Sequence, residues 1–135
     1  MRETTSESAE SSVRGHLELL VLASLSAAPS HGYALIESLQ HLSGGAFELA
    51  EGSLYPVLHK LEHAGLIRSA WDRASGRRRR VYRITSAGRR ELEMRSRRWR
   101  VIRDAVDSVL AAAVDAGDAI GDPRPRQSRL EATGG

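Results

Sequence analysis

Four consecutive arginines, Arg77, Arg78, Arg79 and Arg80, stand directly before a segment that alternates between polar and apolar residues. They belong to a longer basic stretch, because residues 68–103 hold fourteen arginines against three carboxylates, a net charge of +11, whereas the whole chain carries +3. A local field of that size is typical of a surface that binds a polyanion, nucleic acid first and an anionic membrane second. A basic face that is only solvated is the alternative.

A second pattern that could carry chemistry is HKLEH, at residues 59–63. Two histidines four residues apart, beside Glu62, match the H-x-x-E-H pattern of a class of zinc proteases. The pattern lies in a segment whose apolar spacing assigns it to a packed helix, and no downstream acidic ligand in a helical context accompanies it. Because the chain has no cysteine, thiolate metal sites and disulfides are excluded. We therefore expect no catalytic residue, no metal and no cofactor, and the sequence disfavours an enzyme.

Three helices are predicted to position the arginine run. The first covers residues 13–27, where apolar side chains recur at helical spacing before a Pro and Gly break. The second runs over about residues 33–42, with Tyr33, Ile36 and Leu39 on its buried face. The third follows a short extended connector. Its core-facing residues are expected to be Leu54, Leu58 and Leu61.

A β-hairpin is predicted next, from two alternating segments at residues 66–71 and 80–84 with a polar tip between them. Three helices followed by a hairpin is the element order of a winged helix-turn-helix. In that architecture the third helix enters the DNA major groove and the hairpin, or wing, lies along the neighbouring backbone or minor groove. The predicted fold class is therefore mainly α with a small β-hairpin, and the sheet core begins at Val81 and Ile84.

The third helix and the wing supply the candidate DNA contacts. Ser53 is expected to be the N-cap of this helix, and Tyr55 and Lys60 are the first candidates for contacts to phosphates or base edges. The wing arginines would mostly meet phosphates. Tyr33 is open between packing against the third helix and presenting its hydroxyl to the backbone, and for any single residue an ordinary exposed position is the alternative. The DNA-binding candidates are Ser53, Tyr55, His59, Lys60, Arg77, Arg78, Arg79, Arg80 and Tyr33.

A long helix is predicted over residues 85–116, capped by Thr85. Its apolar residues repeat every seven positions, with others three residues later, which is the a/d seam of a coiled coil, interrupted at Arg95. A second copy of the chain is the expected cover for this seam, and folding back onto the first three helices is the alternative. The expected interface or effector-binding residues are Trp99, Leu92, Ile102, Val106 and Val109.

The two tryptophans differ in their expected roles. Trp99, at the centre of the seam, could form an aromatic wall around a flat ligand together with its symmetry mate, or could simply fill the seam. Trp71, at the end of the first strand, is expected to pack between the wing and the long helix.

Several separate motifs resemble one family. RGHLELLVLASL, HGYALIESL, GGAFELAEGSLYPVLHKLEHAGLI and GRRRRVYRITSAGRREL, taken in order over about residues 13–109, closely resemble the PadR family of transcriptional regulators. The resemblance implies a homodimeric winged-helix repressor that responds to small, often aromatic or multidrug-like molecules. The single C-terminal helix is similar to the short subgroup, in which one long helix per subunit builds the dimer. The acidic N-terminal extension and the Pro- and Arg-containing tail fall outside the family pattern.

The chain is accordingly divided into four parts. We expect a disordered extension at residues 1–12, a winged helix-turn-helix domain at 13–84, a dimerisation helix at 85–116 and a disordered tail at 117–135. The polar N-terminus lacks the apolar core of a signal peptide, and the longest apolar run is too short to cross a bilayer. A cytoplasmic protein with no membrane partner is expected.

Two functions from different classes remain. The first is a ligand-responsive repressor that binds a palindromic duplex as a homodimer and is released by a small aromatic or drug-like effector. The second is a winged-helix adaptor that binds RNA or an acidic protein partner without operator specificity.

Overall fold

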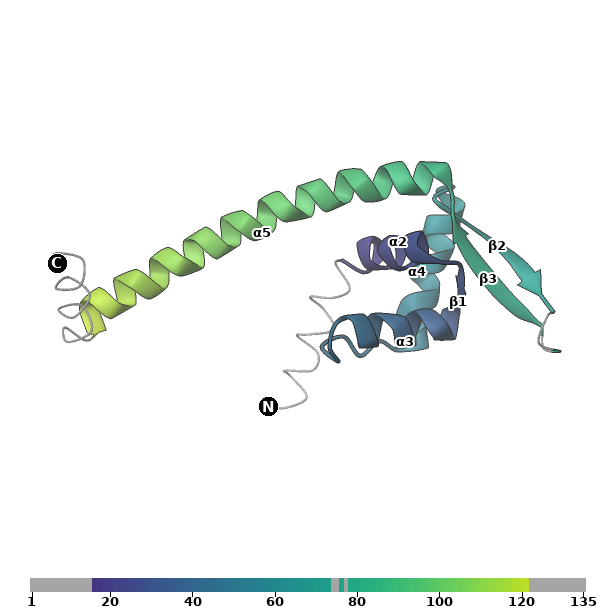
Figure 1. Cartoon of the computed structure of the whole chain (residues 1–135), viewed down its shortest axis with the longest axis horizontal. Helices are drawn as coiled ribbons and strands as arrows, with labels where there is room; N and C mark the ends of the chain where they lie inside the picture. The colour runs from purple at the N-terminus through teal and green to yellow at the C-terminus, as the bar shows by residue number, and fades with distance from the viewer. Residues whose placement is uncertain (1–15, 74–75, 77, 122–135) are drawn as a thin grey trace. The chain divides into compact units, whose positions relative to one another are not determined.

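The computed structural model describes residues 16–73, 76 and 78–121 of the 135-residue chain (Figure 1). Within these residues the chain is mainly helical with one small antiparallel sheet and a long C-terminal helix, which confirms the predicted fold class. The extension at 1–12, Arg77 and residues 122–135 lie outside the described residues. The elements are α2 (Leu17–Ala27), β1 (Ser30–His31), α3 (Gly32–Leu42), α4 (Glu51–His63), β2 (Ile67–Asp72), β3 (Arg79–Ile84) and α5 (Ser86–Gly121).

Two compact units divide the chain, and the boundary falls inside α5 between Ser96 and Arg97. The core of the first unit is built mostly from leucines of α2, α3 and α4, with one residue each from β2 and β3. Full burial of such a side chain contributes about 1.5–3 kcal/mol. The buried residues are Leu17, Val21, Leu22, Leu25, Leu35, Leu39, Leu54, Leu58, Leu61, Ile67 and Tyr82.

Packing selects the buried face of α2, and the buried face of α3 differs from the predicted one. In α2, Leu22 is fully buried and Leu20 only partly, because this helix is apolar on most sides and its spacing alone does not select one face. In α3, Leu35 and Leu39 are buried, whereas Tyr33 is 60% exposed. Side chains four residues apart share a helical face, and Tyr33 stands outside the face of Leu35 and Leu39. Tyr33 is therefore not part of the buried face of α3, contrary to the prediction from the apolar spacing.

The start of α4 also differs from the prediction. Ala50 occupies the N-cap position, and Ser53 is the third helical residue, whose N–H donates to the Ala50 carbonyl at 3.0 Å. Ser53 is therefore not the N-cap. Pro56 lies in the second turn, not the first, and cannot donate to the carbonyl of Gly52. The three core leucines of this helix, Leu54, Leu58 and Leu61, are confirmed.

The sheet has three strands in the order β1-β3-β2, and both pairings are antiparallel. The sequence predicted only the hairpin of β2 and β3, because the two residues of β1 are too few to show an alternating pattern. Ser30 and His31 of β1 pair with Tyr82 and Val81 of β3. The inward side chain of β3 is Tyr82, at 6% exposure, and not Val81 as predicted.

A capped and tightly packed first turn begins α5. The Thr85 hydroxyl accepts the N–H of Gly88 at 3.0 Å and donates to the Gly65 carbonyl at 2.7 Å, which confirms the predicted cap. A Cβ at Gly88 would collide with the carbonyl oxygen of Leu66 and with the Ile84 side chain. Glycine at this position therefore allows the helix to approach the strand.

The helix α5 continues to Gly121, beyond the predicted end at residue 116. The expectation of a disordered tail from residue 117 is therefore wrong for residues 117–121. Gly117 lowers helix propensity by about 1 kcal/mol relative to alanine but does not end the helix.

Candidate nucleic-acid interface

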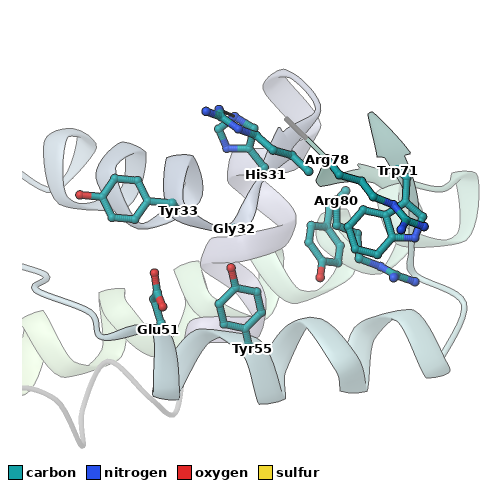
Figure 2. Close-up of a pocket in the computed structure, with 10 residues that line it drawn as sticks. His31, Gly32, Tyr33, Glu51, Tyr55, Trp71, Arg78 and Arg80 are labelled. Atoms are coloured by element: carbon teal, nitrogen blue, oxygen red, sulfur yellow. Dashed lines mark hydrogen bonds between the residues drawn. The ribbon is translucent and has the colours of Figure 1, made fainter. Parts of the chain in front are cut away.

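A groove of about 670 Å³ lies between the start of α3, the N-terminal half of α4 and the wing, which consists of β2, β3 and the turn between them (Figure 2). Phenol, indole and guanidinium groups dominate its walls, so the groove suits an anionic ligand with polar acceptor oxygens. It brings together the predicted Tyr33, Tyr55, Arg78, Arg79 and Arg80. The full lining is His31, Gly32, Tyr33, Glu51, Tyr55, Trp71, Arg78, Arg79, Arg80 and Tyr82.

Tyr55 reaches from α4 to the first residue of α3. A Cβ at Gly32 would come within 2.5 Å of the Tyr55 hydroxyl, so only glycine leaves room for the phenol there. In Figure 2 the ring of Tyr55 points from α4 toward Gly32. Tyr55 is 39% exposed, so the side chain packs over Gly32 and still borders the groove. Burial raises the pKa of Tyr82, the phenol on β3 in the same lining.

Two arginines of the wing lie against the ring of Trp71. The guanidinium carbons of Arg78 and Arg80 lie 4.5 and 5.2 Å from the centroid of its ring, which is the geometry of cation–π contacts. Trp71 itself is 51% exposed. The prediction that it packs between the wing and the long helix is therefore wrong, and Trp71 belongs to the groove. Nη1 of Arg79 lies 3.1 Å from Nε2 of His31, which links the hairpin to β1.

Hydrogen bonds also join the wing to α4. The carboxylate of Glu62 accepts the Ser69 N–H at 3.0 Å and the Ser69 hydroxyl at 2.7 Å. Nε of Arg80 donates to the same hydroxyl at 2.8 Å. Helix α4 and the wing are thus connected through Ser69.

Lys60 points to a different part of the molecule. Its Nζ lies 2.8 Å from Oε2 of Glu18, and Nη1 of Arg95 lies 2.7 Å from Oε1 of the same carboxylate. Arg95 also contacts Glu91 at 2.6 Å. Hydrogen bonds from Arg95 first, and then from Lys60, lower the pKa of Glu18 despite its partial burial. The structure therefore pairs Lys60 with α2, outside the groove.

The remaining helix candidates lie outside the groove as well. Ser53 is half-buried, and His59 is exposed one turn after Tyr55. Several residues that line the groove were not predicted from the sequence. Two features could have indicated them: a glycine, Gly32, directly before an apolar helix, and a tryptophan, Trp71, in an arginine-rich hairpin. The lining residues that were not predicted are His31, Gly32, Glu51, Trp71 and Tyr82.

In the second unit, α5 carries a series of exposed apolar side chains. Trp99 is 36% exposed, and Ile102 and Val106 are both 49% exposed. Leu92, which was predicted for the same seam, is partly buried against the core of the first unit. The other exposed apolar residues of this stretch are Val101, Val109, Leu110 and Val114.

In the described part of the chain, no group of three or more His, Cys, Asp or Glu side chains is placed to hold a metal ion. Glu62, the acid of the zinc-protease-like pattern, is instead hydrogen-bonded to Ser69. No helix among the described residues combines the length and the apolar character needed to cross a membrane.

Known proteins are similar to this chain in both sequence and fold. The sequence matches the transcriptional regulator PadR-like family over residues 21–94. The transcriptional regulator Rv3488 of Mycobacterium tuberculosis is 49% identical over 53 residues, which are 39% of this chain and 50% of that protein.

The solved structures that resemble the chain include two members of the same family. The crystal structure of a PadR family transcriptional regulator from Eggerthella lenta has 34% identity and a TM-score of 0.68, covering 81% of this chain and 94% of that one. A PadR-like transcriptional regulator from Bacillus cereus has 29% identity and a TM-score of 0.65, covering 73% and 94%. Regulators of this family bind DNA and are generally not enzymes. Because the family match extends over more than half of the sequence and the fold agrees, the chain belongs to the PadR-like family of transcriptional regulators.

Proposed function

We propose that the protein is a ligand-responsive repressor that binds a palindromic operator as a homodimer and is released by a small aromatic or drug-like effector. The observation that carries the DNA-binding part is the groove, in which tyrosines of α3 and α4 face the arginines of the wing. Phenols and guanidiniums are side chains that commonly contact DNA phosphates.

The residues of this surface take two roles in the proposal. Arg78, Arg79 and Arg80, together with Arg77, anchor the wing to backbone phosphates, and Tyr33 and Tyr55 donate their hydroxyls to the same backbone. Ser53 and His59, on α4, are left to approach base edges in the major groove. Lys60 can join them only by sharing or giving up its ion pair with Glu18.

The second part of the proposal concerns α5. Its seam of Trp99, Ile102, Val106 and Val109 packs against the same seam of a second copy, because regulators of this family are typically dimers and these side chains are exposed. A symmetric dimer carries two copies of α4, which matches the two half-sites of a palindrome. Residues 16–84 would then form the DNA-binding part and α5 the dimerisation part.

The effector site is assigned to Trp99 and its symmetry mate, whose indoles could stack on a flat aromatic ligand. This assignment rests on the position of Trp99 within the seam. If Trp99→Ala leaves both dimerisation and the fluorescence response to aromatic ligands unchanged, the assignment is wrong.

A binding experiment tests the DNA-binding proposal. Fluorescence anisotropy with a labelled duplex from the gene's own upstream region should show binding that resists competitor DNA and RNA. If three arginines per subunit contact phosphates, log K should fall with log salt with a slope of about −5. Equal binding to any polyanion, lost together at moderate salt, would contradict the repressor and favour an adaptor for RNA or acidic proteins.

A further inference from the structure

A short chain of hydrogen bonds has a direction that the geometry fixes. The Ser69 hydroxyl has a single proton, which it donates to Oε2 of Glu62 at 2.7 Å. Its lone pair therefore accepts Nε of Arg80, at 2.8 Å. This series of hydrogen bonds runs from Arg80 on β3 through Ser69 on β2 to Glu62 on α4, and it joins three elements that border the groove.

Helix stability does not explain the carboxylate at this position. Glu62 is the last residue but one of α4, where a negative charge is repelled by the helix dipole. The neighbouring wing is strongly basic and, in the proposed function, must attract a polyanion, so a carboxylate also opposes that attraction. The two hydrogen bonds that Glu62 accepts from Ser69 indicate another role, which is to hold the residue that contacts Arg80.

These hydrogen bonds restrict how Arg80 can bind a ligand. With Nε bonded to Ser69, the two Nη groups are the donors that Arg80 can offer to a phosphate. Trp71 is the residue directly opposite Arg80 across the hairpin, and its ring centroid lies 5.2 Å from the guanidinium carbon. The plane of the guanidinium is therefore set from two sides before any ligand arrives.

We propose that Glu62 and Ser69 are positioning residues for DNA binding, which orient Arg80 toward one backbone phosphodiester in each subunit. This inference rests on the proposed DNA-binding function. An ordered side chain loses less entropy on binding, so the arrangement should strengthen binding by about threefold to tenfold in Kd.

The first test uses the sign of an effect. Glu62→Ala and Glu51→Ala each remove one carboxylate from α4, Glu51 from the groove lining and Glu62 from the end next to the wing, and charge alone would make both variants bind DNA more tightly. We expect Glu51→Ala to bind the upstream duplex more tightly and Glu62→Ala to bind it about threefold to tenfold more weakly. Tighter binding by Glu62→Ala would overturn the proposal. Thermal unfolding of both variants shows whether they are folded.

The second test is a double-mutant cycle on the same duplex. Ser69→Ala should weaken binding without changing the salt slope, whereas Arg80→Ala should weaken binding and reduce the slope by about 0.9 per subunit. In the Arg80→Ala background, Ser69→Ala should have no further effect, and Ser69→Thr, which keeps the hydroxyl, should restore wild-type binding. Additive losses would mean that Ser69 has only a structural role, and the proposal would be wrong.

Two further variants keep the inference testable. If Ser69→Ala does not fold, Arg80→Lys removes the Nε donor but keeps the charge, and it should lose affinity at an unchanged salt slope. Arg83→Ala, on the opposite face of the same strand, removes an equal charge and should show no coupling to Ser69. Specific wild-type binding with an ineffective Ser69→Ala would refute this inference alone, whereas absent specific binding by the wild type would refute the proposed function.

Discussion

At the scale of single residues, Glu18 decides what Lys60 can do. The carboxylate holds the Lys60 ammonium at 2.8 Å and the Arg95 guanidinium at 2.7 Å, so one acid of α2 binds cations from α4 and α5. Reasoning from the sequence assigned Lys60 to DNA because a cation on a recognition helix commonly meets phosphate. Its partner lies 42 residues earlier in the chain, and no local pattern could reveal a contact over that separation.

The pairing makes stability depend on pH. The pKa of Glu18 is lowered in the folded protein from its ordinary value of 4.5, so ionised Glu18 stabilises the fold above that pH. The contribution is lost as the pH falls through the lower, folded pKa. Glu18→Gln should reduce the free energy of unfolding by about 1 kcal/mol near neutral pH and by almost nothing at strongly acidic pH.

Urea unfolding at the two pH values measures this difference. Glu37→Gln, a change at an exposed carboxylate on α3, serves as the control and should have little effect at either pH. An equal loss for Glu18→Gln at both pH values would mean that packing, and not the charge of Glu18, accounts for its contribution.

At the scale of elements, the sequence predicted most of the helices and the hairpin, and its errors have physical causes. The core leucines of α4 follow from their spacing, but the start of this helix does not, because Ala50 has no side chain that marks an N-cap. The strand β1 has only two residues, and its pairing with β3 is set by tertiary structure. Of the residues that line the groove, Tyr55 and Arg78, Arg79 and Arg80 were predicted DNA contacts because of their chemistry, whereas Gly32 and Trp71 enter the groove through packing.

The junction between the sheet and α5 gives a prediction at this scale. Gly88→Ala places a Cβ against the backbone carbonyl of Leu66, which cannot move aside as a side-chain tip can. The energy of this clash should exceed the stabilisation that alanine gives a helix relative to glycine, so the free energy of unfolding should fall by about 1–3 kcal/mol. Gly117→Ala is the matched control in the same helix, because a Cβ at that position would meet nothing within 4 Å, and it should leave stability unchanged or raise it. Thermal unfolding of both variants distinguishes the clash from a general effect of alanine in α5.

At the scale of the whole molecule, α5 serves two parts of the proposed regulator. Its first turns belong to the winged unit, where Leu92 packs against the core and Arg95 pairs with Glu18. From Trp99 onward the same seven-residue spacing continues with exposed side chains. The sequence therefore indicated a long seam, but only the structure assigns its beginning to intramolecular packing. In the proposed dimer, the exposed remainder is the surface left for a second copy.

A single charge in this remainder tests the dimer. Val106 occupies the proposed seam, and each subunit of a two-fold dimer buries the same residues, so Val106→Glu introduces two buried carboxylates per dimer. Burial of unpaired charges is strongly unfavourable, and we expect a monomer in sedimentation equilibrium together with at least a tenfold loss of affinity for the upstream duplex, on the order of 1.4 kcal/mol. Val101→Glu is the control, because Val101 is 69% exposed and its position in the helical repeat lies well away from Val106. A monomeric Val101→Glu with a dimeric Val106→Glu would place the interface on the other side of α5, and the seam of Trp99, Ile102, Val106 and Val109 would then not be the dimer interface.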